Sequence, residues 1–289
     1  MEVIENKLLR ATINPKGAEL SGLFNKKEEL EYLWNGDPAF WGKQSPVLFP
    51  IVGTLKGNSY LYKGKSYQLP RHGFARDRSF EVEKRAGDSK LFLLKSDMET
   101  QKVYPFDFEF RIRYALEENK LIVSYEIKNS GEDDFYFSVG GHPAFKLPLV
   151  DNTAYEDYYL EFEQNENAGR WPISGDGLIE KEPISVLNET NILPISKQLF
   201  AKDALVFKYL NSSFVKLKSD KTPRGLTFHF PGFPFLGIWA AKGADFICIE
   251  PWCGIADTVD SDQQLVNKEG IILLKNAEEF KRSWSVELY

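Results

Sequence analysis

The sequence LIVSYEIK, residues 121–128, places an apolar side chain at every odd-numbered position and, after Ile122, a polar one at every even-numbered position. Successive side chains of a β-strand point to opposite faces, so this spacing predicts a strand with one buried and one solvated face. The same alternation recurs at residues 80–83, 160–163 and 284–288. Strands with one wet face are therefore expected along the whole chain, including its last residues.

The segments between these strands contain turn signals rather than helices. Lys63-Gly64-Lys65 is expected to close a hairpin between residues 60–62 and 66–69. Two brief windows, Met98–Val103 and Ser196–Ala204, have a helical pattern. They are too short to cover a parallel sheet, which disfavours an α/β architecture.

These patterns predict an all-β fold, a large antiparallel β-sandwich. Residues 169–193 are rich in Gly, Pro, Asn and Glu with little periodicity, and we interpret them as a long surface excursion. No shift in composition accompanies this stretch, and all-β domains commonly exceed 200 residues. We therefore expect residues 1–289 to form a single domain.

Composition narrows the classes of function. The hydrophobic share of 43% and the charged share of 27% are typical of a soluble globular protein. The aromatic share of 14% suits the half-buried faces of sheets, and an aromatic face also suits the apolar side of a sugar ring. The net charge of −6, without a basic stripe, argues against nucleic acid and against an acidic membrane surface as partners.

The termini and cysteines add expectations about location and redox state. Residues 1–6 lack the pattern of a signal peptide, and no run of about 18 apolar residues occurs, so a cytoplasmic location is expected. Cys248 and Cys253 have no second Cys or His pair nearby, which predicts reduced thiols and no metal cluster. The sequence indicates neither an oligomeric state nor a partner protein.

Two of the three histidines lie beside glycine. His72 precedes Gly73, and His142 follows Gly141. Glycine permits close backbone approach next to a group that titrates near neutrality, as in many functional sites. Each could equally be a structural or surface residue. His229 occupies an ordinary strand pattern and is interpreted as structural.

Two carboxylates stand out. Glu250 follows an apolar run at what we take to be the end of a core strand, where a carboxylate is costly unless it is hydrogen-bonded or functional. Partial burial would raise its pKa toward the range of a general base, although a structural pairing is the alternative. Asp203 precedes an apolar strand and could be a cap. No phosphate loop, serine nucleophile elbow or metal-spaced cluster is present, so hydride transfer, nucleotide hydrolysis and esterase chemistry lack support.

Seven segments in order along the chain resemble the aldose 1-epimerase, or galactose-mutarotase-like, family and its bacterial LacX-type branch. They are Gly17-Ala18-Glu19-Leu20, Glu31-Tyr32-Leu33-Trp34, Ser45–Gly53, Arg71–Arg76, Gly140–Phe145, Asp203-Ala204-Leu205 and Ile249-Glu250-Pro251-Trp252. The resemblance covers nearly the whole chain, and the order and coverage of the segments make it specific.

The resemblance implies a β-supersandwich with an open cleft for an aldohexose, without metal or organic cofactor. Glu250 would be the general base that takes the proton from the anomeric hydroxyl, and His142 the general acid that protonates the ring oxygen. His72 would hydrogen-bond the sugar near the ring oxygen. Arg71 and Asp203 would hold sugar hydroxyls. One carboxylate and one imidazole suffice for such ring opening.

Aromatic and basic residues extend these expectations. Trp252, beside Glu250, is expected in the wall of the cleft, whereas Trp239 and Trp34 are expected in the core. Relatives that act on hexose 6-phosphates share the segment around Arg76, whose guanidinium could bind phosphate. The second arginine expected in those relatives is replaced here by Lys43-Gln44-Ser45, which favours an unphosphorylated sugar.

The sequence leaves other functions open. The expected activity is that of a mutarotase, which interconverts the α and β anomers of a hexose. The alternatives are a hexose-6-phosphate mutarotase and a non-catalytic carbohydrate-binding protein on the same fold. A glycosidase would need two catalytic carboxylates, and only Glu250 has a persuasive context.

Overall fold

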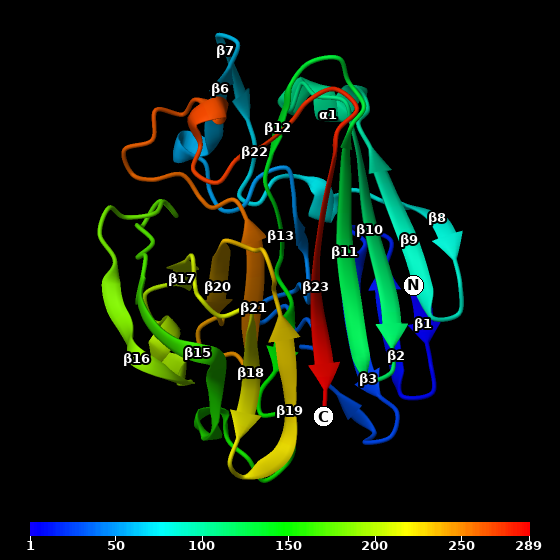
Figure 1. The fold of residues 1–289 in the computed structure, drawn as a ribbon, viewed down its shortest axis with the longest axis vertical. Coiled ribbons are helices and arrows are strands. Elements are labelled where there is room, and N and C mark those ends of the chain that lie inside the picture. The colour runs from blue at the N-terminus through cyan, green and yellow to red at the C-terminus, as the bar shows by residue number, and fades with distance from the viewer.

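The computed structural model describes residues 1–289, and every pair of neighbouring strands in its sheets is antiparallel (Figure 1). The expected all-β sandwich is confirmed. The largest sheet has nine strands, in the spatial order β16 (Ile184–Pro194), β15 (Tyr158–Arg170), β18 (Phe214–Ser219), β19 (Thr222–His229), β23 (Glu279–Leu288), β11 (Lys120–Asn129), β10 (Phe108–Glu117), β9 (Ser89–Lys95) and β8 (Glu81–Arg85).

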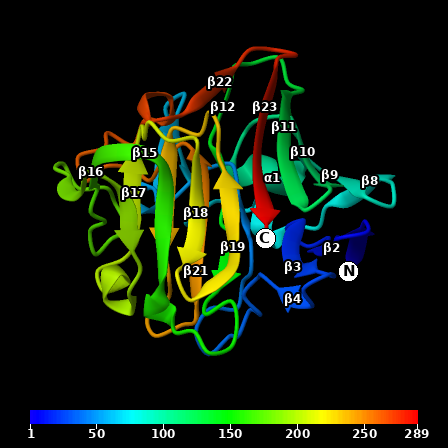
Figure 2. The same cartoon turned by 60° about the horizontal axis from the view of Figure 1, so that its bottom comes forward.

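Two smaller sheets lie behind the nine-stranded sheet (Figures 1 and 2). The six-stranded sheet contains β17 (Leu205–Lys208), β20 (Phe235–Trp239), β21 (Phe246–Cys253), β13 (Val139–Gly141) and β5 (Val47–Leu48) in that order, with β14 (Ala144–Lys146) also paired to β21. The four-stranded sheet contains β1 (Glu2–Glu5), β2 (Leu9–Asn14), β3 (Glu19–Asn25) and β4 (Leu30–Glu31).

Short elements complete the fold. Two-stranded ribbons join β12 (Phe135–Phe137) to β22 (Ile272–Leu274) and β6 (Ser59–Tyr62) to β7 (Lys65–Gln68). The α-helix is α1 (Met98–Val103), and single 3₁₀ turns occur at η1 (Lys56–Asn58), η2 (Ala75–Asp77), η3 (Tyr155–Asp157), η4 (Lys197–Phe200) and η5 (Leu265–Asn267). No helix is long and apolar enough to cross a membrane.

The alternating sequence produces the two-sided strands. In β11 the odd-numbered residues 121–129 are all buried, as the pattern in LIVSYEIK predicts. Buried aromatic side chains join the layers: Phe145 of β14 packs against Phe228 of β19, and Phe162 of β15 against Phe207 of β17. The core therefore fills the space between the nine-stranded and six-stranded sheets.

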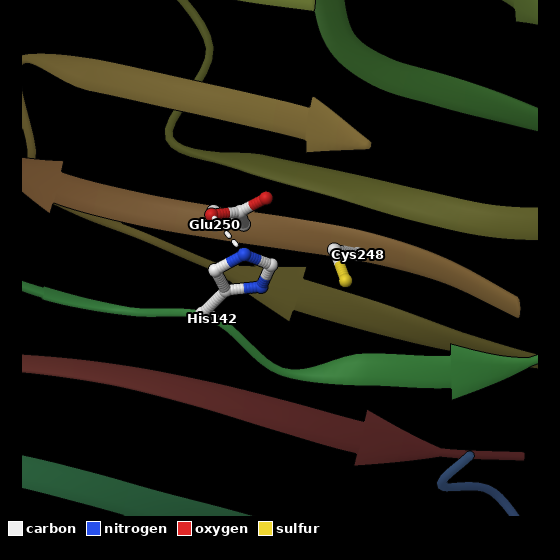
Figure 3. Close-up of side chains that lie close together, drawn as sticks. All are labelled: His142, Cys248 and Glu250. Atoms are coloured by element: carbon white, nitrogen blue, oxygen red, sulfur yellow. Dashed lines mark ion pairs between the residues drawn. The ribbon is translucent and has the colours of Figure 1, made fainter. Parts of the chain in front are cut away.

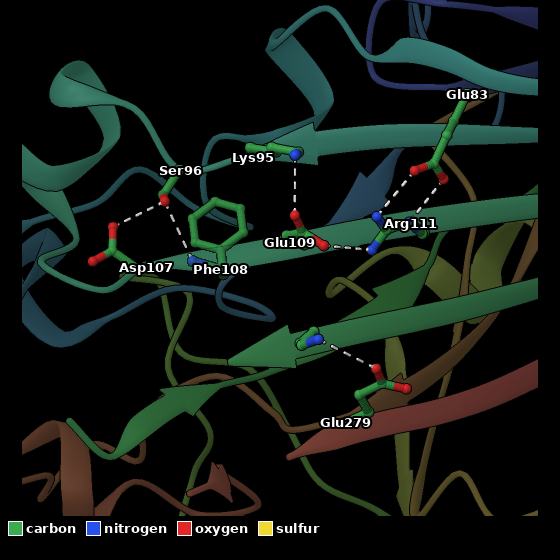
Figure 4. Close-up of polar contacts among 9 residues, drawn as sticks. Glu83, Lys95, Ser96, Asp107, Phe108, Glu109, Arg111 and Glu279 are labelled. Carbon is green, nitrogen blue, oxygen red and sulfur yellow. Dashed lines mark hydrogen bonds and ion pairs between the residues drawn. The ribbon is translucent and has the colours of Figure 1, made fainter. Parts of the chain in front are cut away.

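The outer face of the nine-stranded sheet is polar and forms ion pairs across its strands (Figure 4). Arg111 of β10 contacts Glu83 at 2.8 Å and 3.0 Å through two guanidinium nitrogens. The same guanidinium contacts Glu109 at 2.8 Å, and Lys95 of β9 lies 3.0 Å from Glu109. The charged side chains on the solvent-facing positions of these strands are therefore paired with one another. We looked for the functional site elsewhere in the fold.

Several local predictions are confirmed and two are corrected. The 63–65 hairpin is the turn between β6 and β7, and Met98–Val103 is α1. The helix expected over Ser196–Ala204 is only the single turn η4. The expected surface excursion at 169–193 is wrong for its second half, because residues 184–194 form β16.

The strand β16 escaped detection for a physical reason. It is the edge strand of its sheet and pairs only with β15, with shifts of register between them. Only two of its side chains are buried, so selection for an apolar face is weak and the period of two is absent from its sequence.

Candidate active site

A cavity of about 730 Å³ opens on the six-stranded sheet. Val206 of β17 lines it, whereas the next residue, Phe207, packs against Phe162 of the nine-stranded sheet, so the cavity lies on the opposite face. The seven residues that the sequence nominated all line it: Arg71, His72, Arg76, His142, Asp203, Glu250 and Trp252. The structure thus brings together groups that are up to 181 positions apart, counted from residue 71 to residue 252. A mostly preformed concave site of this size is typical of small-molecule binding.

Glu250 lies inside β21, two strand positions beyond Cys248 and three before the strand ends, not at the strand end as expected. Its side chain is 2% exposed. Burial raises the pKa of Glu250 well above 4.5, while Arg71 lowers it and Asp203 raises it further. A carboxylate in this position is therefore able to hold a proton at a pH where an exposed glutamate cannot.

His142 faces Glu250 because of strand register. β13 pairs Gly140 with Trp252, and β14 pairs Ala144 with Cys248, so the residue between them falls opposite Glu250. His142 Nε2 lies 3.2 Å from Glu250 Oε2 (Figure 3). Burial lowers the pKa of His142 to about 3, and the positive charges of the two arginines at the cavity contribute in the same direction.

The two pKa shifts act together. Burial disfavours the charged form of both groups, so the pair holds one proton over the pH range between its two titrations. In the neutral form that proton sits on Glu250, and in the ion-paired form it sits on His142. The 3.2 Å contact is a salt bridge only in the second form. Such a pair can accept a proton on one atom while it delivers one from the other.

His72 is fixed by two hydrogen bonds to one residue. Its backbone N–H donates to Gly53 O at 2.9 Å, and its Nδ1 accepts from Gly53 N–H at 3.1 Å. The backbone of His72 has φ of 68°, an unusual value for a non-glycine residue that these bonds hold in place. Because Nδ1 is an acceptor, neutral His72 carries its proton on Nε2. Burial lowers the pKa of His72 well below 6.5, so this neutral form is the relevant one.

The charged groups at the mouth of the cavity are less constrained. Arg76 donates to Arg71 O at 2.8 Å and lies 3.8 Å from Asp77, while Arg71 has no carboxylate within ion-pair distance. Asp203 has φ of 98°, and its Oδ1 accepts from Ala204 N–H at 2.7 Å. This bond reaches only the next residue, and β17 rather than a helix follows, so the helix or turn cap expected for Asp203 is not formed. The residue lines the cavity instead.

Tryptophans supply much of the apolar wall. Trp252 lines the cavity as expected, and so does Trp239, which the sequence assigned to the core. Trp34 is buried as expected. Trp41 also lines the cavity and was not nominated, because an isolated aromatic residue in a loop resembles any core residue in sequence. Only its neighbours in the folded structure show that Trp41 faces the cavity and not the core.

The first half of the 169–193 stretch forms another part of the wall. Residues Ile173, Ser174, Gly175, Gly177 and Ile179 line the cavity. Ile179 N–H donates to Asp257 O at 2.8 Å, which joins this segment to the chain after β21. The sequence of this stretch has little hydrophobic periodicity, so it indicated a loop and not a part of the cavity wall.

His229 lies outside the cavity, on β19, where its ring packs against Phe214. This agrees with the structural interpretation. Both cysteines are free and buried. Cys248 lies close to the acid–base pair, and one donor atom each from His142, Cys248 and Glu250 lie within 4.8 Å of one another (Figure 3). This is a donor set that a divalent metal could use, and His142 and Glu250 can equally act as a bare acid–base pair.

Comparisons with known proteins agree with this architecture. A family model described as aldose 1-epimerase matches residues 2–272. The chromosomal protein LacX of Lactococcus lactis subsp. lactis is 30% identical, over 99% of this chain and 98% of its own length.

Solved structures match as well. A galactose mutarotase related enzyme from Lactobacillus acidophilus is 38% identical, with a TM-score of 0.95 over 100% of this chain and 97% of that one. A galactose mutarotase-like protein from Lactobacillus casei is 30% identical, with a TM-score of 0.92 over 100% of both chains.

Proposed function

The chain belongs to the aldose 1-epimerase family, and we propose that it is a mutarotase that interconverts the α and β anomers of an aldohexose. The observation that carries the proposal is the buried contact of 3.2 Å between His142 Nε2 and Glu250 Oε2 in the wall of a cavity of about 730 Å³. Anomerisation needs one proton removed and one delivered at neighbouring oxygens, and this pair holds a base and an acid side by side.

The proposed reaction starts from the ion-paired form. The Glu250 carboxylate takes the proton of the anomeric hydroxyl while the His142 imidazolium protonates the ring oxygen. The bond from C1 to the ring oxygen breaks, and the C1 carbonyl forms. The pair is then in its neutral form, so its proton count is unchanged.

Ring closure reverses these transfers. The C1–C2 bond rotates in the open-chain aldehyde and presents the opposite face of the carbonyl. His142 then takes the proton of the attacking hydroxyl, and Glu250 returns one to the carbonyl oxygen. The ion pair is regenerated, and no covalent intermediate is needed.

The remaining residues of the cavity would orient the sugar. His72 would donate from Nε2 to an oxygen of the ring, since its Nδ1 is occupied by Gly53. Arg71 and Asp203 would bind hydroxyl groups, and Trp252 would face the apolar side of the ring. These contacts would hold C1 and the ring oxygen against the acid–base pair.

Polarimetry of freshly dissolved α-D-glucose and α-D-galactose tests this function. The wild-type protein is expected to accelerate the change of rotation. Glu250→Gln and His142→Asn should each lower the rate by about two to four orders of magnitude, the usual contribution of general acid–base groups, while sugar binding persists. Near-wild-type turnover in Glu250→Gln would refute the role of Glu250. Binding without acceleration in the wild type would favour a carbohydrate-binding protein.

A hexose 6-phosphate is the second candidate substrate. Three cationic side chains, Arg71, Arg76 and Lys202, line the cavity, and Arg76 approaches a carboxylate no closer than 3.8 Å. Arg71 has no carboxylate partner and Arg76 has only the long contact with Asp77, so both guanidinium groups could bind a phosphate. A coupled anomer assay with glucose 6-phosphate separates the two: acceleration with the phosphate alone, and its loss in Arg76→Gln, would make the phosphorylated sugar the substrate.

A further inference from the structure

Trp41 covers one face of the His142 imidazole. The two rings are stacked, with centroids 4.9 Å apart and planes inclined by 29°. Trp239 meets the same imidazole at 5.6 Å and 89°, and meets Trp41 at 5.4 Å and 77°. The imidazole of His142 is therefore packed between two indole rings.

The segment between β4 and β5 fixes the Trp41 ring from behind. Trp41 N–H donates to Asp37 O at 2.9 Å, and Trp41 O accepts from Trp34 Nε1 at 2.9 Å. Gln44 ties this loop down by donating from Nε2 to Trp34 O at 2.6 Å. These bonds hold the backbone of Trp41, and its indole packs against Phe246 with centroids 5.5 Å apart.

The two arginines near His142 oppose its protonation. The titratable and charged groups that face it are Glu250 and Cys248 from β21, and Arg71, His72 and Arg76 from the segment before β8. Glu250 is the anion among them that stabilises an imidazolium. A cation over the face of an indole is stabilised by the ring quadrupole, most strongly where water is excluded.

We propose that Trp41 is a positioning residue that stabilises the imidazolium form of His142 by a cation–π contact, and so selects the ion-paired form from which the sugar ring opens. This rests on the proposed mutarotase function. The contact is specific to one form of the pair because the neutral imidazole gains much less from the indole face. Trp41 then influences whether the proton of the pair lies on His142 or on Glu250, in addition to forming part of the cavity wall.

Progressive fluorination of the indole tests this without changing its shape. Trp41 is replaced by mono-, di-, tri- and tetrafluorotryptophan, and kcat and KM are measured separately by polarimetry. Fluorine withdraws charge from the ring face, so kcat should fall stepwise, by about tenfold at full substitution. The matched control is Trp34, which contacts the same loop but whose ring meets Phe40 edge-on and Phe246 at a tilt, and not His142. The same series there should leave kcat unchanged.

A second measurement on the sugar-free protein separates this proposal from the proposed function. The ¹⁵N chemical shifts of His142, followed as the pH is lowered toward 3, report the pH at which the imidazolium forms. That midpoint should move to lower pH stepwise with fluorination at Trp41 and not at Trp34. A protein without mutarotase activity that still shows this response would retain the contact and lose the function. An unchanged midpoint, or a change in KM alone, would overturn the proposal and leave Trp41 as a sugar contact.

Discussion

At position 250 a carboxylate lies inside a strand whose eight residues are all buried. Burial raises the pKa of Glu250 well above the 4.5 of an exposed glutamate. A group with a raised pKa in the folded state contributes stability that is complete below the pKa of the unfolded chain, and that is lost as pH rises through the folded value. The chemistry proposed for Glu250 therefore has a cost in stability at higher pH.

Glu250→Gln removes that cost, because glutamine does not ionise. The difference in melting temperature between the variant and the wild type is expected to shift in favour of the variant as pH rises from 4.5 through the folded pKa. Thermal unfolding followed by circular dichroism over this range measures it. A difference that stays constant with pH would mean that Glu250 is not the group that titrates.

The proposed acid–base pair also predicts the pH dependence of the proposed activity. The active form of the pair carries one proton in total. Activity is therefore expected to be lost at low pH, where both Glu250 and His142 are protonated, and at high pH, where neither is. Because burial lowers the pKa of His142 to about 3, the acid limb of kcat/KM should lie well below 6.5. A pH profile from polarimetry checks this. An acid limb at 6.5 would instead indicate an ordinary, solvated histidine.

At the scale of elements, β20, β21 and β13 form the floor on which the site is built. The Trp252 indole of β21 lies over Gly237 of β20 and Gly140 of β13, where there is no side chain to displace it. A Cβ atom at Gly237 would meet Trp252 at 2.5 Å, and one at Gly140 would meet it at 2.7 Å. The two glycines therefore set the depth of this part of the cavity.

Gly237→Ala is expected to push the indole toward the sugar. Overpacking of this kind should destabilise the protein by about 1–3 kcal/mol and raise KM more than it lowers kcat. Urea unfolding and polarimetry provide the two readouts. Gly87→Ala is the matched control, since no atom lies within 4 Å of a Cβ there. An unchanged KM in Gly237→Ala would show that Trp252 does not contact the sugar.

At the scale of the whole molecule, a buried ion pair joins distant segments around the cavity. Lys268 Nζ lies 2.8 Å from Asp257 Oδ1, with the side chains 2% and 3% exposed. Asp257 also accepts from Lys56 N–H through its other carboxylate oxygen, and its carbonyl accepts from Ile179 N–H. The pair thus joins the wall segment that contains Ile179 to the segments that contain Lys56 and Lys268.

Lys268→Met is expected to destabilise the protein by about 3–5 kcal/mol, because it leaves the Asp257 carboxylate buried without its cation. The matched control is Lys275→Met, which removes the exposed pair with Asp134 and should cost about 0–1 kcal/mol. Urea unfolding measures both variants. Equal costs would mean that water reaches Asp257.

The fold was more predictable from sequence than the composition of the site. Alternation along strands such as β11 is a local signal, so the sandwich could be inferred, whereas the edge strand β16 buries too little to leave one. The resemblance located seven residues that do line the cavity. Trp41 and Trp239 were missed or misplaced, because an aromatic residue that faces a cavity has the same local sequence pattern as one in the core.

The sequence by itself determined the strand character of the chain, which follows from neighbouring residues, and its resemblance to a known family named the acid–base candidates. Only the tertiary structure decided that His142 and Glu250 meet. Their contact depends on the register of β13 and β14 against β21, set by pairing between segments about a hundred residues apart. Their perturbed pKa values and the Trp41 stack follow from the same pairing, because burial and contact are properties of the assembled sheets and have no local signature in the chain.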